Sequence, residues 1–506
     1  MAHFDPLTTN AIELVTLLSA NKLTSVDIVT QYLDQIGRRN PSLHAFLSIA
    51  PRDLLLREAS ELDKERLQGR MRSPLHGIPI VIKDVFITAS LLGMPTTAGS
   101  PALLDAKASS NSPIVQRLLD AGMIILGKTN MTELAGMKHP TVMPGWSPVA
   151  GQTLSPYVGP IEEGETLLGH SAPGGSSTGS AVAVAAGFAP LALGTETIGS
   201  IITPASRAGL YALKPTVGAV QGTEKGMYTL TEFFDSPGGM AKGVRDLREV
   251  MEVLMPNRGV GYRMGVSGEG CGRWEGLEVG FLDAGVWKMA HGMCKDIGGA
   301  GREMGEAYES VVEKIRAQGG TVKYPAEIAD IRALSVDGED AIMPIAFWDF
   351  KNICIPRFLG GFDEAPVKNL ADIVRFNEEH KEQCLPPPYT GQEDLKKALA
   401  NNATEEHITA LKVALRKKAK NILNEALDSA GVTLIAALAD SPLCIHAAAA
   451  GYPIATVPLG QLRYNGRPFG LCVIARGDDE ETLLRFMDMY ESTVASPRPT
   501  PLFRGL

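Results

Sequence analysis

The chain has 506 residues, of which 44% are hydrophobic and 21% charged, and its formal net charge is −9. This is the composition of an ordinary globular protein with ample material for a large core. The sequence contains no Lys- and Arg-rich run with interleaved aromatic residues, so we expect no nucleic-acid partner and no attraction to anionic membranes.

The N-terminal region predicts a cytoplasmic protein. Residues 1–15 lack the basic start and the long apolar stretch of a signal peptide. Asp5 and Glu13, in the absence of an arginine, argue against a mitochondrial transit sequence. The most apolar stretch, 181–194, is interrupted by a glycine and a proline and is too short to span a bilayer.

Two helices are predicted first, over 9–20 and 25–39. Thr24 precedes the second helix and Asp27 follows three residues later, a pattern in which each side chain caps the other's backbone. The run from Gly77 to Lys83 is short, continuous and dominated by Ile and Val. Such a run predicts a buried strand, here one that ends at a lysine.

The next segments alternate between apolar elements and loops. Residues 114–119 predict a helix, and 123–126 a buried strand. Residues 137–175 are rich in Gly, Pro, Ser and Thr, and a loop of that length inside a compact chain is usually functional or disordered. A helix of small residues over 180–187 and a short strand over 191–193 follow, and a tight loop closes the region at 196–200.

The second half also alternates between helices and strands. It predicts a strand, a helix and a strand over 278–282, 302–318 and 321–324, and charged helices near 366–380 and 405–428. Three buried strands and a closing helix are expected over 433–438, 454–457, 470–474 and 480–490. This alternation favours an α/β layered fold. Length alone suggests about three domains, but neither a repeat nor a low-complexity linker marks a boundary.

Three short motifs match catalytic patterns by chance. The segment from Gly122 to Thr129 fits the Walker A pattern, but its interior is Met-Ile-Ile-Leu and a predicted helix precedes it, so a buried strand is favoured. The segment from Gly175 to Gly179 fits the nucleophile elbow around Ser177, yet it lacks the strand that an elbow requires. Ser19 to Lys22 fits the lactamase pattern without its companion motifs.

Cysteine and histidine offer no metal site or catalytic triad. The six cysteines are scattered, with no Cys-x-x-Cys pair and no histidine at zinc spacing, so we interpret them as reduced thiols. None of the nine histidines stands in an arrangement typical of a triad. We therefore expect no metal and no cofactor.

Two loops rich in Gly and Ser remain, Pro173–Ser180 and Gly194–Ser200, on either side of one small-residue helix and strand. Each loop alone is commonly a linker, and a lysine at a strand end usually reaches solvent. Linkers, however, are not normally followed at once by apolar elements that bury them. The two loops and Lys83 are therefore candidates for one catalytic site.

These segments resemble the amidase signature family. The resemblance covers about 10–245 and 430–492, and its motifs follow one another in the family's order. The matching segments are 75–84, 127–130, 174–181, 194–200, 213–216, 235–241 and 450–458. Residues 371–380 are similar to the fungal branch in particular. The resemblance implies an α/β fold with a large mixed β-sheet core covered by helices on both faces.

The resemblance also implies one domain over 1–506. It would consist of N-terminal helices at about 9–70, a catalytic core at about 75–245, a variable middle at about 246–430 and C-terminal core strands at about 431–492.

The family's functional residues carry over onto matching positions. Ser200 becomes the nucleophile that forms an acyl-enzyme, Ser176 the bridging hydroxyl and Lys83 the general base. The backbone amides from Thr197 through Ser200, with Ile198 and Gly199 between them, are expected to form the oxyanion hole. By its position after Asn130, Ala135 is expected to line the acyl pocket. The resemblance further implies a cis peptide bond between Gly175 and Ser176.

The chemistry agrees with these residue types. A serine hydroxyl is a weak nucleophile until a base removes its proton. A lysine can do so only when neutral, and burial favours the neutral amine. A second hydroxyl between base and nucleophile can accept from one and donate to the other. Backbone amides in a tight turn suit a developing oxyanion.

The sequence departs from the commonest family pattern at three positions. Glu196 replaces Asp, Ile198 replaces a Gly and Ile202 replaces an Arg. A β-branched residue is strained at positive φ, so we expect φ to be negative at Ile198, with the side chain directed toward the pocket or the core. Ile202 removes a cation near the site, and Arg207 need not replace it.

The leading prediction is an amidase that releases ammonia or an amine from a small-molecule amide. An esterase or an acyl-transferring biosynthetic relative with the same acyl-enzyme, a subunit of the glutamine-dependent tRNA amidotransferase, and a non-catalytic binding relative remain open. Trp146 and Tyr157 indicate either an apolar acyl pocket or loop packing. The oligomeric state, including a homodimer, also stays open.

Overall fold

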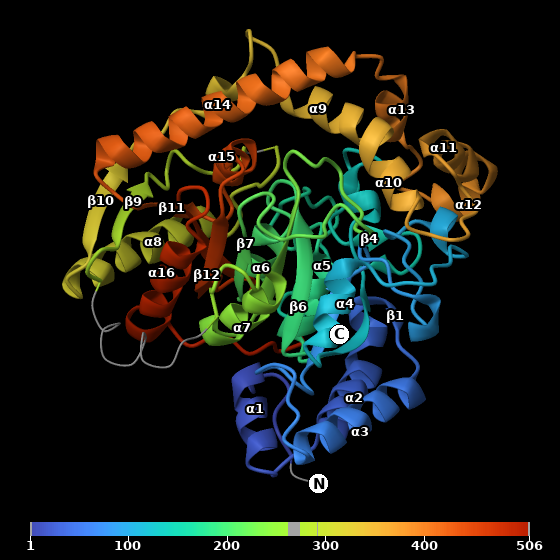
Figure 1. The fold of residues 1–506 in the computed structure, drawn as a ribbon. Coiled ribbons are helices and arrows are strands. Elements are labelled where there is room, and N and C mark those ends of the chain that lie inside the picture. Colours follow the sequence, from blue (N-terminus) through green and yellow to red (C-terminus); the bar gives the residue numbers. More distant parts are fainter. Residues whose placement is uncertain (1–2, 262–273, 291, 504–506) are drawn as a thin grey trace.

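The computed structural model describes residues 3–261, 274–290 and 292–503, and its centre is one mixed sheet of eleven strands (Figure 1). The strand order is β1-β3-β2-β6-β8-β7-β12-β13-β11-β9-β10. In chain order the strands are β1 (Phe46–Ile49), β2 (Pro79–Lys83), β3 (Ile124–Thr129), β6 (Leu191–Glu196), β7 (Tyr211–Lys214), β8 (Ser236–Ala241), β9 (Glu278–Leu282), β10 (Thr321–Ala326), β11 (Leu434–Leu438), β12 (Ile454–Gln461) and β13 (Pro468–Ile474). A two-stranded ribbon, β4 (Trp146–Ser147) with β5 (Gly151–Gln152), stands apart.

The sheet is parallel in two places and antiparallel elsewhere. β2 runs parallel to both of its neighbours, β3 and β6, and β9 runs parallel to β10 and β11. Parallel strands are buried on both faces, which explains why β2 and β3 read as continuous apolar runs. The predicted strand over 123–126 is found, but β3 continues to Thr129 because Gly127-Lys128-Thr129 pairs with β2.

Helices pack against both faces of the sheet, as predicted. In β8, a Cβ on Gly238 would meet Ile201, whereas a Cβ on Gly239 would meet Leu247 and Val250 of α7. Successive residues of a strand point to opposite faces, so Ile201 and α7 lie on opposite sides of the sheet. The helices flanking the sheet are α4 (Pro113–Asp120), α5 (Thr178–Ala185), α6 (Ile202–Arg207), α7 (Val244–Leu254), α8 (Ala300–Ala317), α15 (Leu443–Ala450) and α16 (Glu480–Thr493).

The two predicted N-terminal helices are found, and a third helix follows them. They are α1 (Ala11–Ser19), α2 (Ser25–Leu43) and α3 (Arg52–Leu67), and Figure 1 shows them grouped below the sheet. The predicted capping pattern of α2 is present, since Thr24 Oγ1 accepts from the Asp27 amide at 3.0 Å and Asp27 accepts from the Thr24 amide at 3.0 Å. α2 runs to Leu43, four residues beyond the prediction.

A helical layer lies over one edge of the sheet. It comprises α9 (Ile342–Asp349), α10 (Ile355–Leu359), α11 (Leu370–Glu379), α12 (Lys381–Cys384), α13 (Glu393–Ala400) and α14 (Glu405–Ala430). Figure 1 shows α14 crossing the top of the molecule, from the side of β10 to the side of α13. The predicted helices near 366–380 and 405–428 correspond to α11 and α14. The division of the chain into one domain with four segments stays a prediction.

The described cysteines are free, as expected. Cys354, Cys384, Cys444 and Cys472 are buried and Cys294 is half-buried, while Cys271 lies outside the described residues. Within the parts of the chain that the structure describes, no helix combines the length and the apolar character needed to cross a membrane.

Candidate active site

Lys83 occupies a fully buried position at the end of β2. The strand lies between β3 and β6, and all five of its residues are buried. The lysine side chain is 0% exposed. The apolar run that predicts the strand therefore also takes the amine out of water.

Two residues surround the Lys83 amine. Its Nζ lies 2.7 Å from Ser176 Oγ, 3.0 Å from Thr195 Oγ1 and 3.3 Å from the Thr195 carbonyl oxygen. A neutral amine has two N–H donors and one lone pair. The two donors fit the two oxygens of Thr195, and the lone pair can then accept the hydroxyl proton of Ser176.

Burial also changes the charge state of Lys83. Desolvation lowers the pKa of Lys83 from its usual 10.5 to about 7, although the nearby carboxylates of Asp235 and Glu196 oppose this shift. Burial in turn raises the pKa of Asp235 to about 6, and it raises the pKa of Glu196 as well. A substantial fraction of Lys83 is therefore neutral near neutral pH.

Ser176 lies in the loop before α5, and its peptide bond to Gly175 is cis, as the resemblance predicts. Ser176 is 4% exposed, and its carbonyl accepts from the Thr132 amide at 3.2 Å. The elbow interpretation of Ser177 has no structural support, because the Ser177 hydroxyl donates to the Thr195 carbonyl at 3.1 Å and α5 is preceded by loop rather than by a strand.

Ser200 comes from the turn between β6 and α6. Its carbonyl accepts from the Ser177 amide at 3.1 Å, and this bond joins the two Gly/Ser loops. Ser200 is half-buried, whereas Ser176 is buried. The structure thus brings the loops of Ser176 and Ser200 together beside Lys83.

Glu196 shapes the turn that carries Ser200. Its carboxylate accepts from the amides of Ile201 and Ile202 at 2.7 and 2.9 Å. A backbone hydrogen bond from Gly199 also lowers the pKa of Glu196, against the larger effect of burial. Glu196 therefore anchors the start of α6 with its carboxylate, an anion at a helix N-terminus.

The turn accommodates Ile198 without strain, as predicted. Positive φ falls on the next residue, Gly199, at +74°, and Ile198 is absent from the described residues with positive φ. The Ile198 side chain packs against an apolar cluster that includes Ile202 and Cys444. The predicted negative φ is confirmed, and the side chain faces the core.

Ala135 lies in a turn that faces the Ser176 loop. It is half-buried in the short helical turn η3 (Glu133–Gly136), with φ of +55°. The Thr132 amide of the same segment is bonded to Ser176. Tyr157 serves loop packing, since it is buried and its hydroxyl donates to the Pro499 carbonyl at 3.0 Å. Trp146 packs on the Tyr389 ring at 4.6 Å.

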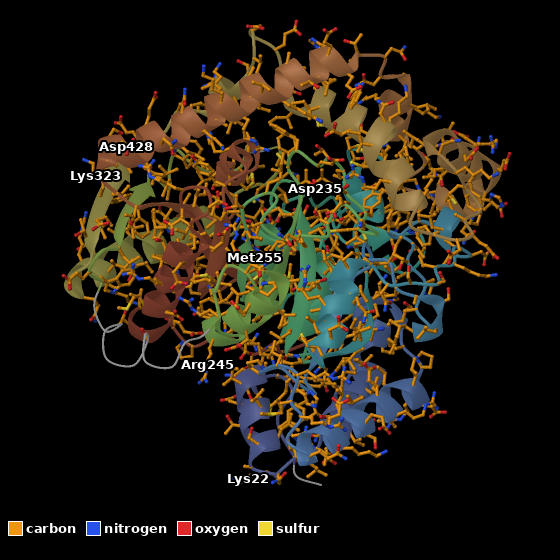
Figure 2. The ribbon with its side chains drawn as sticks, in the orientation of Figure 1. Lys22, Asp235, Arg245, Met255, Lys323 and Asp428 are labelled. Atoms are coloured by element: carbon orange, nitrogen blue, oxygen red, sulfur yellow. The ribbon has the colours of Figure 1, made fainter. Side chains whose placement is uncertain are left out.

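Three polar residues of this region receive no role from the sequence. Thr195 bonds Lys83 directly, Glu196 anchors the turn, and Asp235 acts electrostatically on Lys83. Figure 2 labels Asp235 near the centre of the molecule. Its carboxylate is held by the Leu230 amide at 2.7 Å. The segment that begins at Asp235 matches a family motif, and that match is the signal that could have found it.

The described residues contain no group of three or more His, Cys, Asp or Glu side chains able to hold a metal ion. The polar groups around Lys83 are hydroxyls, carbonyls and two separate carboxylates. What this arrangement can do chemically is move a proton between Lys83 and Ser176.

Comparisons with known proteins agree with these observations. A family model described as Amidase matches residues 27–266. A Schizosaccharomyces pombe protein named as an amidase is 30% identical over 507 residues, which cover 93% of this chain and 82% of that protein. The glutamyl-tRNA(Gln) amidotransferase of Acidothermus cellulolyticus has a subunit that is 37% identical, over 48% of this chain and 44% of that protein.

The solved structures match over a longer part of the chain. The native peptide amidase of Stenotrophomonas maltophilia has a TM-score of 0.83 and 32% sequence identity, covering 98% of this chain and 99% of the peptide amidase. A 6-aminohexanoate cyclic dimer hydrolase, at 20% identity and a TM-score of 0.71, shares the fold.

Proposed function

The chain belongs to the amidase signature family and is a hydrolase of amide C–N bonds, and from this we propose that it cleaves its substrate through an acyl-enzyme on Ser200. In this proposal Lys83 is the general base and Ser176 relays the proton. The observation that carries it is the 2.7 Å separation between Lys83 Nζ and Ser176 Oγ at a fully buried site.

Acylation begins with two proton transfers. Neutral Lys83 accepts the hydroxyl proton of Ser176, and Ser176 takes the proton of Ser200. Ser200 Oγ then forms a bond to the carbonyl carbon of the amide, and the carbonyl π electrons move to oxygen. Thr195 orients the amine throughout, because its two oxygens accept the remaining N–H groups of Lys83.

The negative oxygen of the tetrahedral intermediate needs hydrogen-bond donors. We assign the amides of Thr197, Ile198 and Gly199 to it. The Gly199 amide is shared with the Glu196 carboxylate, so Thr197 and Ile198 carry most of this role. Donors of this kind are worth about 3–4 kcal/mol each in the transition state.

The intermediate collapses as the C–N bond breaks. The proton held by Lys83 returns through Ser176 to the leaving nitrogen, which departs as ammonia or an amine. A water molecule then attacks the acyl group with the same base and relay, and Ser200 is regenerated. The sum is amide plus water giving carboxylic acid plus amine.

The similarity to peptide amidase directs the choice of substrate. That neighbour aligns along 98% of this chain. Peptide amides and small aryl or alkyl amides are therefore the first compounds to test. Similarity to the tRNA amidotransferase is limited to 48% of this chain, which favours an amidase that acts alone.

The experiment is a panel of amides and matched esters, assayed for released ammonia, amine or alcohol with the purified protein and with Ser200→Ala. We expect turnover of at least one amide by the wild-type protein and none by the variant. Turnover that persists in Ser200→Ala would contradict the assignment of the nucleophile. Turnover of esters alone would replace the amidase by an esterase.

A further inference from the structure

Arg207 is one of the largest fully buried side chains in the described part of the protein, with 2% exposure. It is the last residue of α6, the helix that begins two residues after Ser200. The guanidinium does not face the candidate nucleophile. It is turned toward the loop that leads into Ser176.

All five N–H donors of Arg207 are used. Nη1 donates to the Gly169 and Ala172 carbonyls at 2.6 and 2.8 Å, and Nη2 donates to the Leu168 carbonyl at 2.7 Å. Nε and Nη2 donate to one carboxylate oxygen of Asp440 at 3.2 and 3.0 Å. The backbone of 168–172 is thus bound to α6 immediately before the loop of Ser176.

The same loop rests directly on α6. At Gly174, which has φ of +76°, a Cβ would lie 3.1 Å from Arg207 Cδ and 3.1 Å from Thr203 Cγ2. Hence the backbone two residues before Ser176 contacts the helix that starts after Ser200. The Arg207 side chain is part of that contact and also its hydrogen-bonding anchor.

A second arginine completes the anchor. Arg467 donates to the other Asp440 oxygen at 2.8 Å and to His170 Nδ1 at 2.8 Å. Burial alone would raise the pKa of Asp440, but the charges of Arg207 and Arg467 hold it below its ordinary value. The carboxylate therefore stays ionised between two guanidinium groups.

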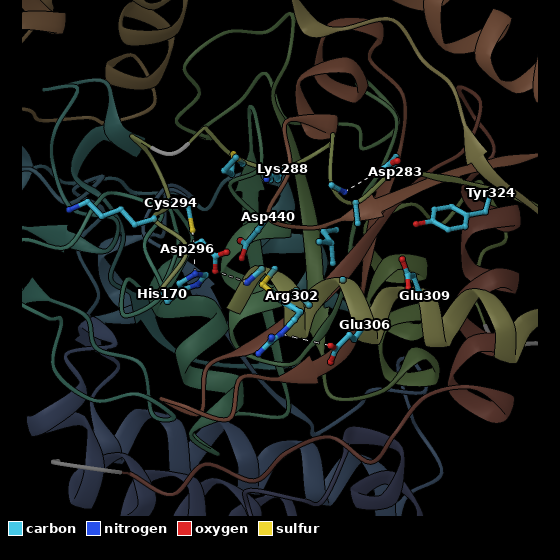
Figure 3. A pocket seen from close by; sticks show the side chains of 18 residues that line it. His170, Asp283, Lys288, Cys294, Asp296, Arg302, Glu306, Glu309, Tyr324 and Asp440 are labelled. Carbon is cyan, nitrogen blue, oxygen red and sulfur yellow. Dashed lines mark hydrogen bonds and ion pairs between the residues drawn. The ribbon is translucent and has the colours of Figure 1, made fainter. Parts of the chain in front are cut away.

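The hydrogen-bonded group formed by Asp440, its two arginines and His170 borders a cavity. A cavity of about 680 Å³ is lined by His170, Asp440, Cys294 and residues of α8. Figure 3 shows His170 and Asp440 at one end of it, with Cys294 next to His170. On this side the loop has fewer packing contacts than in a close-packed interior, so hydrogen bonds such as those to Arg207 and Arg467 contribute more to its position.

We infer that Arg207 is a positioning residue of the hydrolytic reaction, fixing the loop of Ser176 against the helix that follows Ser200. The inference rests on the proposed acyl-enzyme at Ser200. A lysine cannot replace Arg207, because one ammonium nitrogen cannot reach three carbonyls and a carboxylate at once. Misplacing a reacting group by about 1 Å can cost about 10²-fold in rate.

The test compares Arg207→Lys with Arg248→Lys. Arg248 is a matched control, being 5% exposed and bonded to Glu481 and Asp488, and it lies on α7, on the other face of the sheet. Each protein reacts with a fluorophosphonate well below its melting temperature, and labelling of Ser200 is timed per folded molecule. The kcat and KM for an amide are measured alongside.

We expect Arg207→Lys to be labelled at least about tenfold more slowly, with kcat reduced and KM near that of the wild type. Arg248→Lys should lower the melting temperature but keep the labelling rate. The inference is overturned if Arg207→Lys is labelled at the wild-type rate, or if Arg248→Lys is slowed as much. Should the wild-type protein not be labelled on Ser200, the proposed function fails instead.

A second variant decides the matter if Arg207→Lys does not fold. In Asp440→Asn the side chain has one acceptor oxygen for two arginines. Its NH₂ group must then face the N–H groups of one arginine, which are also donors and cannot bond to it. We expect slower labelling of Ser200 in this variant as well. A wild-type rate in Asp440→Asn would overturn the inference.

Discussion

Lys83 Nζ lies 3.0 Å from Thr195 Oγ1, across the boundary between two parallel strands, β2 and β6. With the carbonyl of the same threonine at 3.3 Å, this contact occupies both donors of a neutral amine. The lone pair is then left for Ser176. In the proposed mechanism Thr195 is therefore an orienting residue for the Lys83 amine.

Thr195→Val tests this contact, because it removes the hydroxyl acceptor and keeps the shape of the side chain. We expect kcat to fall by about tenfold or more, the value of a hydrogen bond to a charged group. The ammonium form loses a stabilising acceptor, so the pKa of Lys83 should decrease further and the acidic limb of the pH–rate profile should move to lower pH.

Thr456→Val provides the control for that change. Thr456 is a buried threonine of β12, three strands away from β6, and its hydroxyl donates to the Leu471 carbonyl at 2.6 Å. The control should keep the wild-type pH profile. An unchanged profile in Thr195→Val would show that the threonine does not orient the amine.

Lys83→Met tests the base. Burial lowers the pKa of Lys83 to about 7, so wild-type activity should increase as the pH rises through about 7 and the amine becomes neutral. The variant should lose about 10²–10⁴-fold in rate, and its remaining rate should not increase as the pH rises through about 7. A pH–rate profile that keeps its limb in Lys83→Met would assign the titration to another group.

The same substitution has a consequence for stability. Between pH 7 and 10.5 the unfolded chain binds a proton at Lys83 that the folded chain does not, so this group makes the free energy of unfolding rise with pH. The free energy of unfolding of the wild type should therefore rise relative to that of Lys83→Met over that range. Denaturant titrations at several pH values measure it, and a constant difference would contradict the depressed pKa.

Ile198→Gly tests whether this departure from the family pattern affects specificity. The side chain packs against the cluster of Ile202 and Cys444, so its removal should cost about 1–2 kcal/mol of stability through lost packing and backbone entropy. Because the side chain faces this cluster and not an acyl pocket, we expect the order of preferred acyl groups to stay as in the wild type, measured as kcat/KM across amides of increasing width.

Ile202→Val is the control for Ile198→Gly, since it trims the same cluster on the first residue of α6. It should lose stability without a change in the order of preferred substrates. A wider range of accepted acyl groups in Ile198→Gly would show instead that the isoleucine limits the acyl pocket.

The sequence could predict those parts of the site that depend on local patterns. The apolar run before Lys83 predicts a buried strand, and the two Gly/Ser loops mark turns that side chains of ordinary size would obstruct. At Gly175, for example, a Cβ would lie 2.7 Å from Thr132 Oγ1. Such local constraints are visible in the order of residue types.

The roles of Thr195, Asp235 and Arg207 depend on contacts between distant segments. Lys83 and Thr195 are 112 residues apart, and Arg207 and Asp440 are 233 apart. Neither periodicity nor composition encodes such pairings. The sequence assigns no role to Arg207, which need not replace the cation missing at Ile202, whereas its donors bind the backbone of 168–172.

The site at which a fluorophosphonate modifies the protein tests the assignment of Ser200 as nucleophile. The folded wild-type protein is labelled, digested and mapped by mass spectrometry, with Lys83→Met as the inactive comparison. We expect a single adduct on Ser200, formed far more slowly in Lys83→Met. An adduct on Ser177, or labelling of Ser200 that is as fast without Lys83, would contradict this expectation.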